Sequence, residues 1–453
     1  MPPQLQSREM NMTLEGKPEN SASKSPTISE TAVHGDLEKD AQIARTVSFD
    51  PPDGGLDAWL TVLGGSLVSF GTFGFTNGFG GFADFYKHEY LANYSPTLVS
   101  MIGALQVFIM YLFAGFSGAV FDAVGPRYLV PGGGIIAVLA LFMLSITQPG
   151  QIYQQFLCQS VLFSLGATFS FFPSMSVISH WFKRKLPYAI GPLTAGGSIG
   201  GIVFPIMLSR LIPRIGFGWT IRIIAFITLF CFTVATFTIK GRRPTKPLPP
   251  LKMLFDFGAF RDPCYVFLAT GCWFSVFAVF NPFFYVGLYA STVHPSSSLN
   301  PYYLSILCAT SIAGRTLPGF VAVYLGRFNV FCVSNLITAV LMITLWYNST
   351  AEPNLIAFAA LYGFFSGPFF SLMPACVSQI SPVEKVGARI GGTFFFMAPA
   401  TLAGTPITGI FIKTQTIANF QHLILFSAVV GLFGTSLLFT SRFILERKIF
   451  AVI

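Results

Sequence analysis

Hydrophobic positions along this chain form runs that are too long and too continuous for the strands or amphipathic helices of a soluble protein. A bilayer core about 30 Å thick requires about 20 apolar residues in each crossing helix. Read against that length, the sequence predicts an all-α membrane protein with twelve transmembrane helices. The predicted spans are 57–81, 96–118, 128–147, 153–175, 187–208, 218–239, 263–290, 301–325, 328–347, 354–377, 387–411 and 421–445.

Polar positions gather at the start of the chain and at its middle. Residues 1–52 are rich in Ser, Glu, Lys, Thr and Pro and contain no apolar run, so a disordered N-terminal tail is predicted there. The longest later interruption, 240–262, follows the sixth predicted helix. Such a linker between two six-helix halves is typical of secondary transporters. We therefore expect six-helix bundles at 53–239 and 263–445, and a short tail at 446–453.

The composition excludes a soluble protein. Of 453 residues, 53% are hydrophobic and only 10% are charged, whereas soluble domains carry about 25% charged residues. A soluble chain of this length would need far more polar surface. The formal net charge is +9, but Lys and Arg stand singly or in short clusters between apolar runs. They therefore indicate membrane topology, and we expect no nucleic-acid partner.

The distribution of Lys and Arg predicts the orientation. If the N-terminus is cytoplasmic, most of these residues fall in inner connections, including the clusters at 183–185 and 240–252. The outer connections then hold only Lys87, Arg210, Arg214 and Lys413. Because cytoplasmic loops carry an excess of positive charge, both termini are expected in the cytoplasm. The plasma membrane is favoured over an internal membrane.

The connection between the second and third predicted helices carries a recognisable motif. It reads Gly118-Ala-Val-Phe-Asp122-Ala-Val-Gly125-Pro-Arg127 and resembles the signature of the major facilitator superfamily at that place. The glycines permit a tight turn and a close approach of helices, and the charged residues can exchange hydrogen bonds with neighbouring helix ends. The resemblance implies a gate that latches two halves of a major facilitator fold. The alternative is an ordinary turn with charged ends.

A weaker copy of this motif lies between the eighth and ninth predicted helices. The chain from Gly314 to Asn329 keeps the Gly and Arg elements, including Gly326-Arg327, but has Val323 where an acidic residue is expected. We therefore expect a weaker second latch.

Further stretches resemble the monocarboxylate transporter family, and its fungal branch in particular. They are Pro52–Trp59, His180–Gly191 with Ala195–Gly201, Gly216–Arg222 and Val386–Gly391. The resemblance covers roughly 53–445. It implies a transporter of a small organic solute that works by alternating access, with Arg389 of the last stretch among the gate residues.

The resemblance also points to binding residues. Animal members of the family use a Lys on helix 1 and an Asp–Arg pair on helix 8 to bind a carboxylate and a proton. In this chain the Arg position corresponds to Arg315, whereas Ser311 stands at the Asp position and Asn77 at the Lys position. Because one of the three remains, small monocarboxylate–proton symport is in doubt. A riboflavin-like substrate and the uptake or efflux of a secondary metabolite are the alternatives.

Charge and polarity at membrane depth select the same candidates. An ionisable side chain near the bilayer centre costs about 3 kcal/mol or more, and Arg315 is the only one well inside a predicted span. Its planar guanidinium can donate two parallel hydrogen bonds to an anion. Alternatively, the side chain snorkels, with its charged end reaching the membrane interface. Asn77 and Asn281 lie on helices 1 and 7, which are expected at the cavity. The alternative is that they join helices by hydrogen bonds.

An aromatic cluster surrounds the Asn281-Pro282 step and consists of Phe280, Phe283, Phe284 and Tyr285. Pro282 removes a helix hydrogen bond, so helix 7 is expected to be able to bend there during rocking of the halves. The cluster either lines the cavity or packs in lipid and core.

Other chemistry is not expected. The seven cysteines lie within apolar stretches and lack metal-ligand spacing, and no phosphate-binding loop or catalytic set is present. We therefore predict no enzyme, no metal and no cofactor. No His, Asp or Glu falls mid-span, which favours facilitated diffusion or coupling carried by the substrate. A membrane sensor would carry a longer cytoplasmic tail. The expected partners are a small-molecule substrate and the lipid bilayer, with a monomer as the transport unit.

Overall fold

The computed structural model describes residues 51–453, except for 184, 243–255, 383–384, 413–415 and 449–453. Residues 51–453 form one compact unit. Apart from its last two residues, the predicted tail lies outside the described residues, as do most of the predicted linker and the end of the C-terminal tail.

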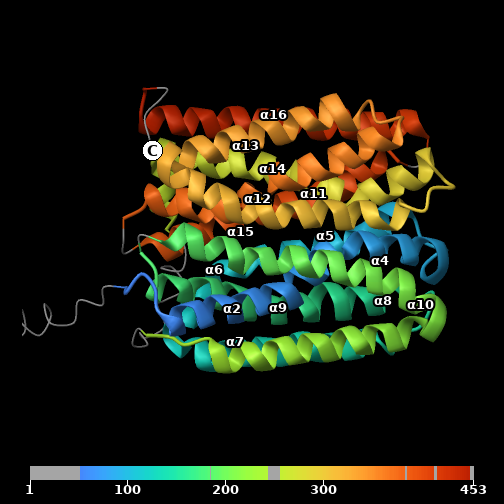
Figure 1. Ribbon diagram of the computed structural model, residues 1–453, viewed down its shortest axis with the longest axis horizontal. Helices are drawn as coiled ribbons and strands as arrows, with labels where there is room; N and C mark the ends of the chain where they lie inside the picture. Colours follow the sequence, from blue (N-terminus) through green and yellow to red (C-terminus); the bar gives the residue numbers. More distant parts are fainter. Residues whose placement is uncertain (1–50, 184, 243–255, 383–384, 413–415, 449–453) are drawn as a thin grey trace, which may run out of the picture. The chain divides into compact units, whose positions relative to one another are not determined.

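The described residues are helical, and the helices lie side by side with roughly parallel axes (Figure 1). Helices α2 to α10 are Leu56–Gly71, Phe73–Asn77, Phe79–Phe85, Pro96–Leu112, Ala114–Val124, Pro126–Leu144, Ile152–Gln155, Phe163–Ser176 and Leu186–Thr238. Helices α11 to α16 are Pro263–Val293, Tyr303–Leu325, Arg327–Leu341, Glu352–Gln379, Val386–Ile410 and Ile417–Leu445. Short π or 3-10 turns extend several of them, namely η1 Tyr86–Tyr90, η2 Phe156–Leu162, η3 Val177–His180, η5 Phe257–Arg261, η6 Asn300–Tyr302 and η7 Met342–Trp346.

The span count follows from length and from one glycine. Within the described ranges, ten helices are long and apolar enough to cross a membrane, or eleven if the bent pair α5 and α6 is one span. Helix α10 has 53 residues, which would make it about 80 Å long, far more than one crossing needs. Gly216 interrupts it with φ 78° and ψ 167°. Dividing α10 there and counting α5 with α6 as one span gives twelve candidate spans among the described residues, the number predicted.

Several helices begin where local sequence signals place them. Asp262 caps α11 by accepting a hydrogen bond from the Cys264 amide at 3.0 Å, with Pro263 in the first turn. Ser95 caps α5 in the same way, accepting from the Leu98 amide at 3.3 Å. Side-chain caps of this kind satisfy a backbone donor that the helix itself leaves free.

The first span differs from its prediction. It was expected at 57–81 but continues through η1 to Tyr90. It is also broken into α2, α3 and α4, at Thr72 with φ −97° and ψ −76° and at Gly78. Lys87, expected in an outer connection, therefore lies within the last turn of this span.

Helix packing brings distant segments together. Helix α2 packs along α10, α7 along α9, α11 along α16 and α12 along α14. Helices α5 and α15, α6 and α15, and α10 and α12 also contact one another. We call the end of these helices that carries Gly125, Gly326 and residues 256–262 the linker end. The other end, with residues 91–95 and 294–299, is the distal end.

Candidate functional site

A cavity of about 460 Å³ opens at the distal end. Its walls come from α4, η1, α5, α10, α11 and α12. Three members of the predicted aromatic cluster, Phe283, Phe284 and Tyr285, line it, whereas Phe280 does not. Helix α11 runs unbroken through Pro282. The cavity has the size of a small-molecule site, and its mainly apolar walls also carry ionisable side chains of α4 and η1.

An aromatic pair lies beside this cavity. Phe79 of α4 and Phe284 of α11 have ring centroids 5.2 Å apart. Both rings pack against Gly103 of α5, where an added Cβ would lie 2.6 Å from Phe284 and closer still to Phe79. The glycine is required here because any larger residue would occupy the space of the two rings. Phe79 is fully buried and does not line the cavity, so the pair bounds the cavity on its inner side.

Arg315 lies deeper, on α12, and is 2% exposed. Its Nη1 donates to the Thr194 carbonyl of α10 at 2.9 Å, and its Nε donates to the Ser311 hydroxyl at 3.2 Å. The guanidinium also lies 4.6 Å from the ring centroid of Phe370 on α14. Its Nη2 is buried and has no hydrogen-bond partner among the described residues. A buried guanidinium nitrogen in this state is ready to donate to a ligand.

Asn77 lies against the same face of α10 that Arg315 contacts. Its Nδ2 donates weakly to the Gly197 carbonyl at 3.4 Å, and its buried Oδ1 finds no partner in the described part of the chain. An added Cβ at Gly201 would lie 3.2 Å from Asn77 Cβ and 2.7 Å from Cys308 Sγ. Positions 194, 197 and 201 fall on one helix face. The structure thus places Asn77, Ser311 and Arg315 along one side of α10.

Asn281 lies elsewhere. Its Nδ2 donates to the Ser427 hydroxyl of α16 at 2.8 Å, and its Oδ1 accepts from the Thr408 hydroxyl of α15 at 3.1 Å. The side chain is fully buried. Because both ends of the amide join neighbouring helices, the geometry favours a packing role over substrate binding.

The predicted gate turn lies at the linker end. Gly125 separates α6 from α7 with φ 82° and ψ 167°, and Gly326 separates α12 from α13 with φ 89° and ψ 144°. Both positive φ values favour glycine, so the two related motifs adopt one backbone turn. Asp122 and Arg127 are exposed beside the first of them. Gly118 has open space where a Cβ would stand, so packing does not require glycine there.

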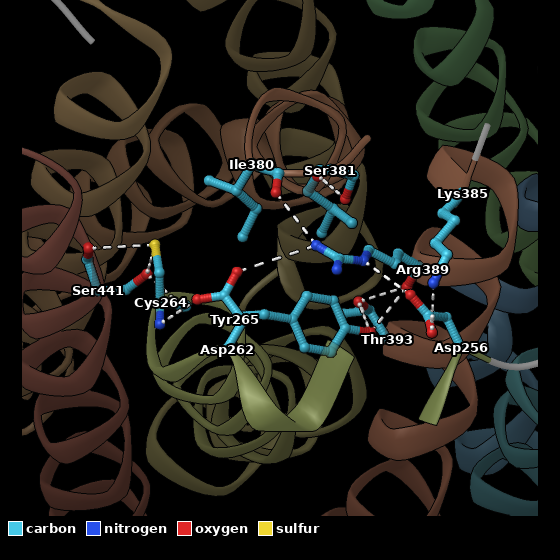
Figure 2. A network of polar contacts seen from close by, with 11 residues as sticks. Asp256, Asp262, Cys264, Tyr265, Ile380, Ser381, Lys385, Arg389, Thr393 and Ser441 are labelled. Carbon is cyan, nitrogen blue, oxygen red and sulfur yellow. Dashed lines mark hydrogen bonds and ion pairs between the residues drawn. The ribbon is translucent and has the colours of Figure 1, made fainter. Parts of the chain in front are cut away.

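Arg389 is the centre of a polar network at the linker end (Figure 2). Its Nε donates to Asp256 Oδ2 at 3.2 Å, and its Nη1 donates to the Ile380 carbonyl at 3.1 Å. Lys385 Nζ lies 3.3 Å from the other oxygen of Asp256. Desolvation tends to raise the pKa of Asp256, but the hydrogen bonds from Arg389 and Lys385 outweigh it and lower that pKa. The network fixes the segment that precedes α11 onto α15.

Comparison with protein families decides the class. The family model described as Major Facilitator Superfamily matches residues 62–349, which is more than half of the chain. This chain belongs to the major facilitator superfamily. It is therefore a multi-pass membrane transporter of a small molecule.

Individual relatives of this major facilitator protein come from fungi. The "MFS transporter asaE" of Aspergillus flavus is 37% identical over 394 residues, which cover 87% of this chain and 88% of the relative. The "Agnestins efflux protein AgnL12" of Paecilomyces divaricatus is 35% identical, with 85% and 87% covered. The "Aspyridones efflux protein apdF" of Emericella nidulans is 33% identical, with 87% and 79% covered.

Sequence reasoning did not find several parts of the site. In the sequence, Phe79 is not distinguished from the many other apolar residues, and Gly103 lies in an apolar run that contains no motif. The Thr194 carbonyl carries no sequence signal, because any residue provides a carbonyl. One usable signal is the density of glycines at 191–201, because small residues are typical of close helix contacts in membranes.

The Asp256 network gives a prediction for stability. Asp256→Asn is expected to lower the free energy of unfolding by about 1–2 kcal/mol, because charge-assisted hydrogen bonds from Arg389 are lost. Because the pKa of Asp256 is lower in the folded protein than its ordinary value of 3.8, the charged carboxylate stabilises the fold at pH values above 3.8. This stabilisation is lost as the pH falls through the lowered pKa. Thermal melting of the purified protein should therefore separate the variant from wild type at pH 7 and less so at acid pH.

The control for this prediction is Asp57→Asn. Asp57 pairs with Lys240 at 2.8 Å, but both side chains are about half exposed. Exposed pairs contribute about 0–1 kcal/mol, so this variant should melt close to wild type. Equal melting temperatures of Asp256→Asn and wild type would show that the network is dispensable for stability.

Proposed function

We propose that this transporter exports a secondary metabolite that combines an apolar body with an acidic group. The observation that carries the proposal is the buried Arg315, whose Nη2 has no partner among the described residues. Two of the relatives bear names that describe efflux of secondary metabolites. The mainly apolar lining of the cavity at the distal end supports a substrate with an apolar body.

The charge balance around Arg315 supports an anionic group on the substrate. Within the described ranges no ion pair involves Arg315, and Ser311 offers its Nε a hydroxyl, which carries no charge. A buried cation without a counter-ion is costly. A carboxylate could take two parallel hydrogen bonds from the guanidinium and supply the missing charge. The substrate would then bring the counter-charge that a protein Asp supplies in the related animal transporters.

The finer family assignment belongs to the same proposal. The resemblance to the monocarboxylate transporter family keeps Arg315 at a binding position but has Ser311 in place of the acidic partner, so small monocarboxylate transport is the second candidate. The resemblance favours an organic acid in both cases. The size of the distal cavity, about 460 Å³, favours the larger one.

Alternating access would proceed by rocking of the halves 53–239 and 263–445 around Arg315. We assign the linker end to the cytoplasm, because the positive charges of the connections gather at that end, and we propose the plasma membrane as the location. Close backbone contacts support closure there. An added Cβ at Gly391 of α15 would lie 2.5 Å from Gly115 Cα of α6, and one at Gly191 of α10 would lie 2.9 Å from the Arg315 carbonyl. Asp122 and Arg127 would latch this closed end.

The test is deletion of the gene in its source organism, followed by mass spectrometry of organic acids in cells and medium. We expect at least one apolar acid to accumulate in the cells and to return to the medium when the wild-type gene is restored. Restoration with Arg315→Ala should fail. If no such metabolite shifts and lactate uptake falls instead, the protein is a small-monocarboxylate transporter.

A further inference from the structure

The distal cavity is lined mainly by apolar groups, but ionisable and polar side chains of α4, η1, α10 and η6 also line it, namely Asp84, Lys87, His88, Glu89, Ser209 and Asn300. Three hydroxyl groups of the lining are engaged within the protein. The Ser100 hydroxyl donates to the Thr97 carbonyl at 2.9 Å, and the Ser291 hydroxyl donates to the Leu288 carbonyl at 3.0 Å. Tyr285, also in the lining, donates to the Thr405 carbonyl at 2.8 Å. Their protons are therefore committed to the protein. On the walls formed by α10, α11 and α12, a ligand meets mainly rings and aliphatic groups, including Phe283, Phe284, Pro205 and Leu304.

The cavity and Arg315 are separate places along α12. Leu304 lines the cavity, whereas Cys308, Ser311 and Arg315 are absent from its lining. Since α12 rises 1.5 Å per residue, Cys308 lies about 6 Å and Arg315 about 16 Å beyond Leu304 along the helix. All three inner residues are at most 2% exposed. A ligand in the cavity therefore does not reach Arg315 unless the structure changes.

Aromatic rings connect the two places. Phe284 contacts Phe280 at 6.4 Å between centroids, Phe280 contacts Phe370 at 5.8 Å, and Phe370 lies under the guanidinium of Arg315. Phe284 also contacts Phe79, which is two residues from Asn77 on the first span. The Phe79–Phe284 pair thus joins α4 to α11 at the boundary between the cavity and the buried site.

We infer that the distal cavity is a ligand-binding station of its own, which takes the apolar, aromatic part of the substrate, and that the Phe79–Phe284 pair separates it from Arg315. The inference rests on the proposed function for the nature of the substrate. It adds a second site, a barrier between the two sites, and recognition of the apolar body in the cavity. Separation of the two rings would let the ligand pass between the distal cavity and the site at Arg315.

The native cysteines make the barrier measurable. All seven lie in the described ranges as buried free thiols, and Cys308 lies one turn of α12 beyond Leu304 of the cavity lining. Gly287 lines the cavity and has open space where a Cβ would stand, so Gly287→Cys places a thiol in the cavity without a clash. A membrane-impermeant maleimide is applied to sealed vesicles in which the distal face of the protein points outward. We expect Gly287→Cys to react and wild-type Cys308 to remain unmodified.

Removal of one ring should open the barrier. Phe284→Ala is expected to raise labelling of Cys308 by an order of magnitude, and the added label should vanish in Phe284→Ala/Cys308→Ser. The matched control is Phe274→Ala, on the same helix, where the ring packs against Phe433 of α16. It should leave Cys308 unlabelled. Phe79→Ala opens the same pair from the other helix and replaces Phe284→Ala if that variant does not fold.

Two results would overturn the inference. If Gly287→Cys does not react, the cavity is not open to ligands. If Cys308 stays unlabelled in folded Phe284→Ala and Phe79→Ala, the pair is not the barrier. Neither result depends on transport, so both can be told apart from a failure of the proposed export function.

The ligand class is tested by protection of Gly287→Cys. We expect 1-naphthoate and its neutral analogue 1-naphthamide to slow labelling, because both carry the aromatic body, and acetate to have no effect. Arg315→Ala should leave this protection unchanged, since Arg315 is not in the cavity. Protection by acetate, or loss of protection in Arg315→Ala, would show that the cavity does not recognise the apolar body.

Discussion

Arg315→Ala is expected to reduce transport of an acidic substrate by roughly 100-fold, which corresponds to about 3 kcal/mol for the loss of one partner of a buried charge pair. The reason is the position of the guanidinium. It is 2% exposed, and it holds the Thr194 carbonyl with one nitrogen while another has no partner among the described residues. The measurement is the initial rate of flux into proteoliposomes as a function of substrate concentration.

The conservative variant separates charge from geometry. Arg315→Lys keeps the positive charge but cannot form two parallel hydrogen bonds, so we expect partial activity with a raised KM. Flux of a neutral analogue of the substrate should fall less than flux of the acid in both variants.

Arg442 offers a matched control among buried arginines. It is also 2% exposed, but its Nε donates to Asn329 at 2.9 Å, and Nη1 and Nη2 donate to the carbonyls of Glu446 and Lys448. Arg442→Ala should therefore lower thermal stability without changing the KM of the folded protein. An unchanged KM and rate in Arg315→Ala would contradict the anion site.

The helical fold could be predicted because the bilayer imposes a length on every apolar run. Span ends agree within a few residues for most helices, and Gly125 and Gly326 were located from the turn that they permit. The first span was harder. Its breaks at Thr72 and Gly78 lie within an apolar sequence that a continuous helix would fit equally well. Tertiary contacts, such as the approach of Gly74 to Gly200, decide its path.

The candidate site was accessible to sequence reasoning only where a residue is unusual for its depth. Arg315 stood out because charge is rare inside a span. Asn281 and Asn77 looked alike in sequence, yet Asn281 is satisfied by Ser427 and Thr408 while Asn77 keeps an unpartnered oxygen. That difference depends on which helices face each other. The same is true of the Phe79–Phe284 pair, whose members are 205 positions apart in the chain.

Gly391→Ala is expected to prevent full closure of the linker end and to shift the protein towards the state open at that end. The added Cβ would lie 2.5 Å from Gly115 Cα, and neither backbone can move aside as a flexible side chain could. Overpacking of this kind costs about 1–3 kcal/mol, which shifts a two-state equilibrium by about 5-fold to more than 100-fold. Because the clash exists only when α6 and α15 are in contact, the cost falls on the closed state.

Two measurements follow the shift. If opening of the linker end closes the distal end, maleimide labelling of Gly287→Cys from the distal face should slow in the Gly391→Ala background, and net flux should fall. The matched control is Gly387→Ala, on the same helix one turn earlier, where an added Cβ meets nothing within 4 Å. It should label and transport like wild type. Equal labelling in the Gly391→Ala and Gly387→Ala backgrounds would show that the contact between α6 and α15 does not control access to the distal cavity. Closure of the linker end would then have to depend on the contact between α10 and α12 at Gly191.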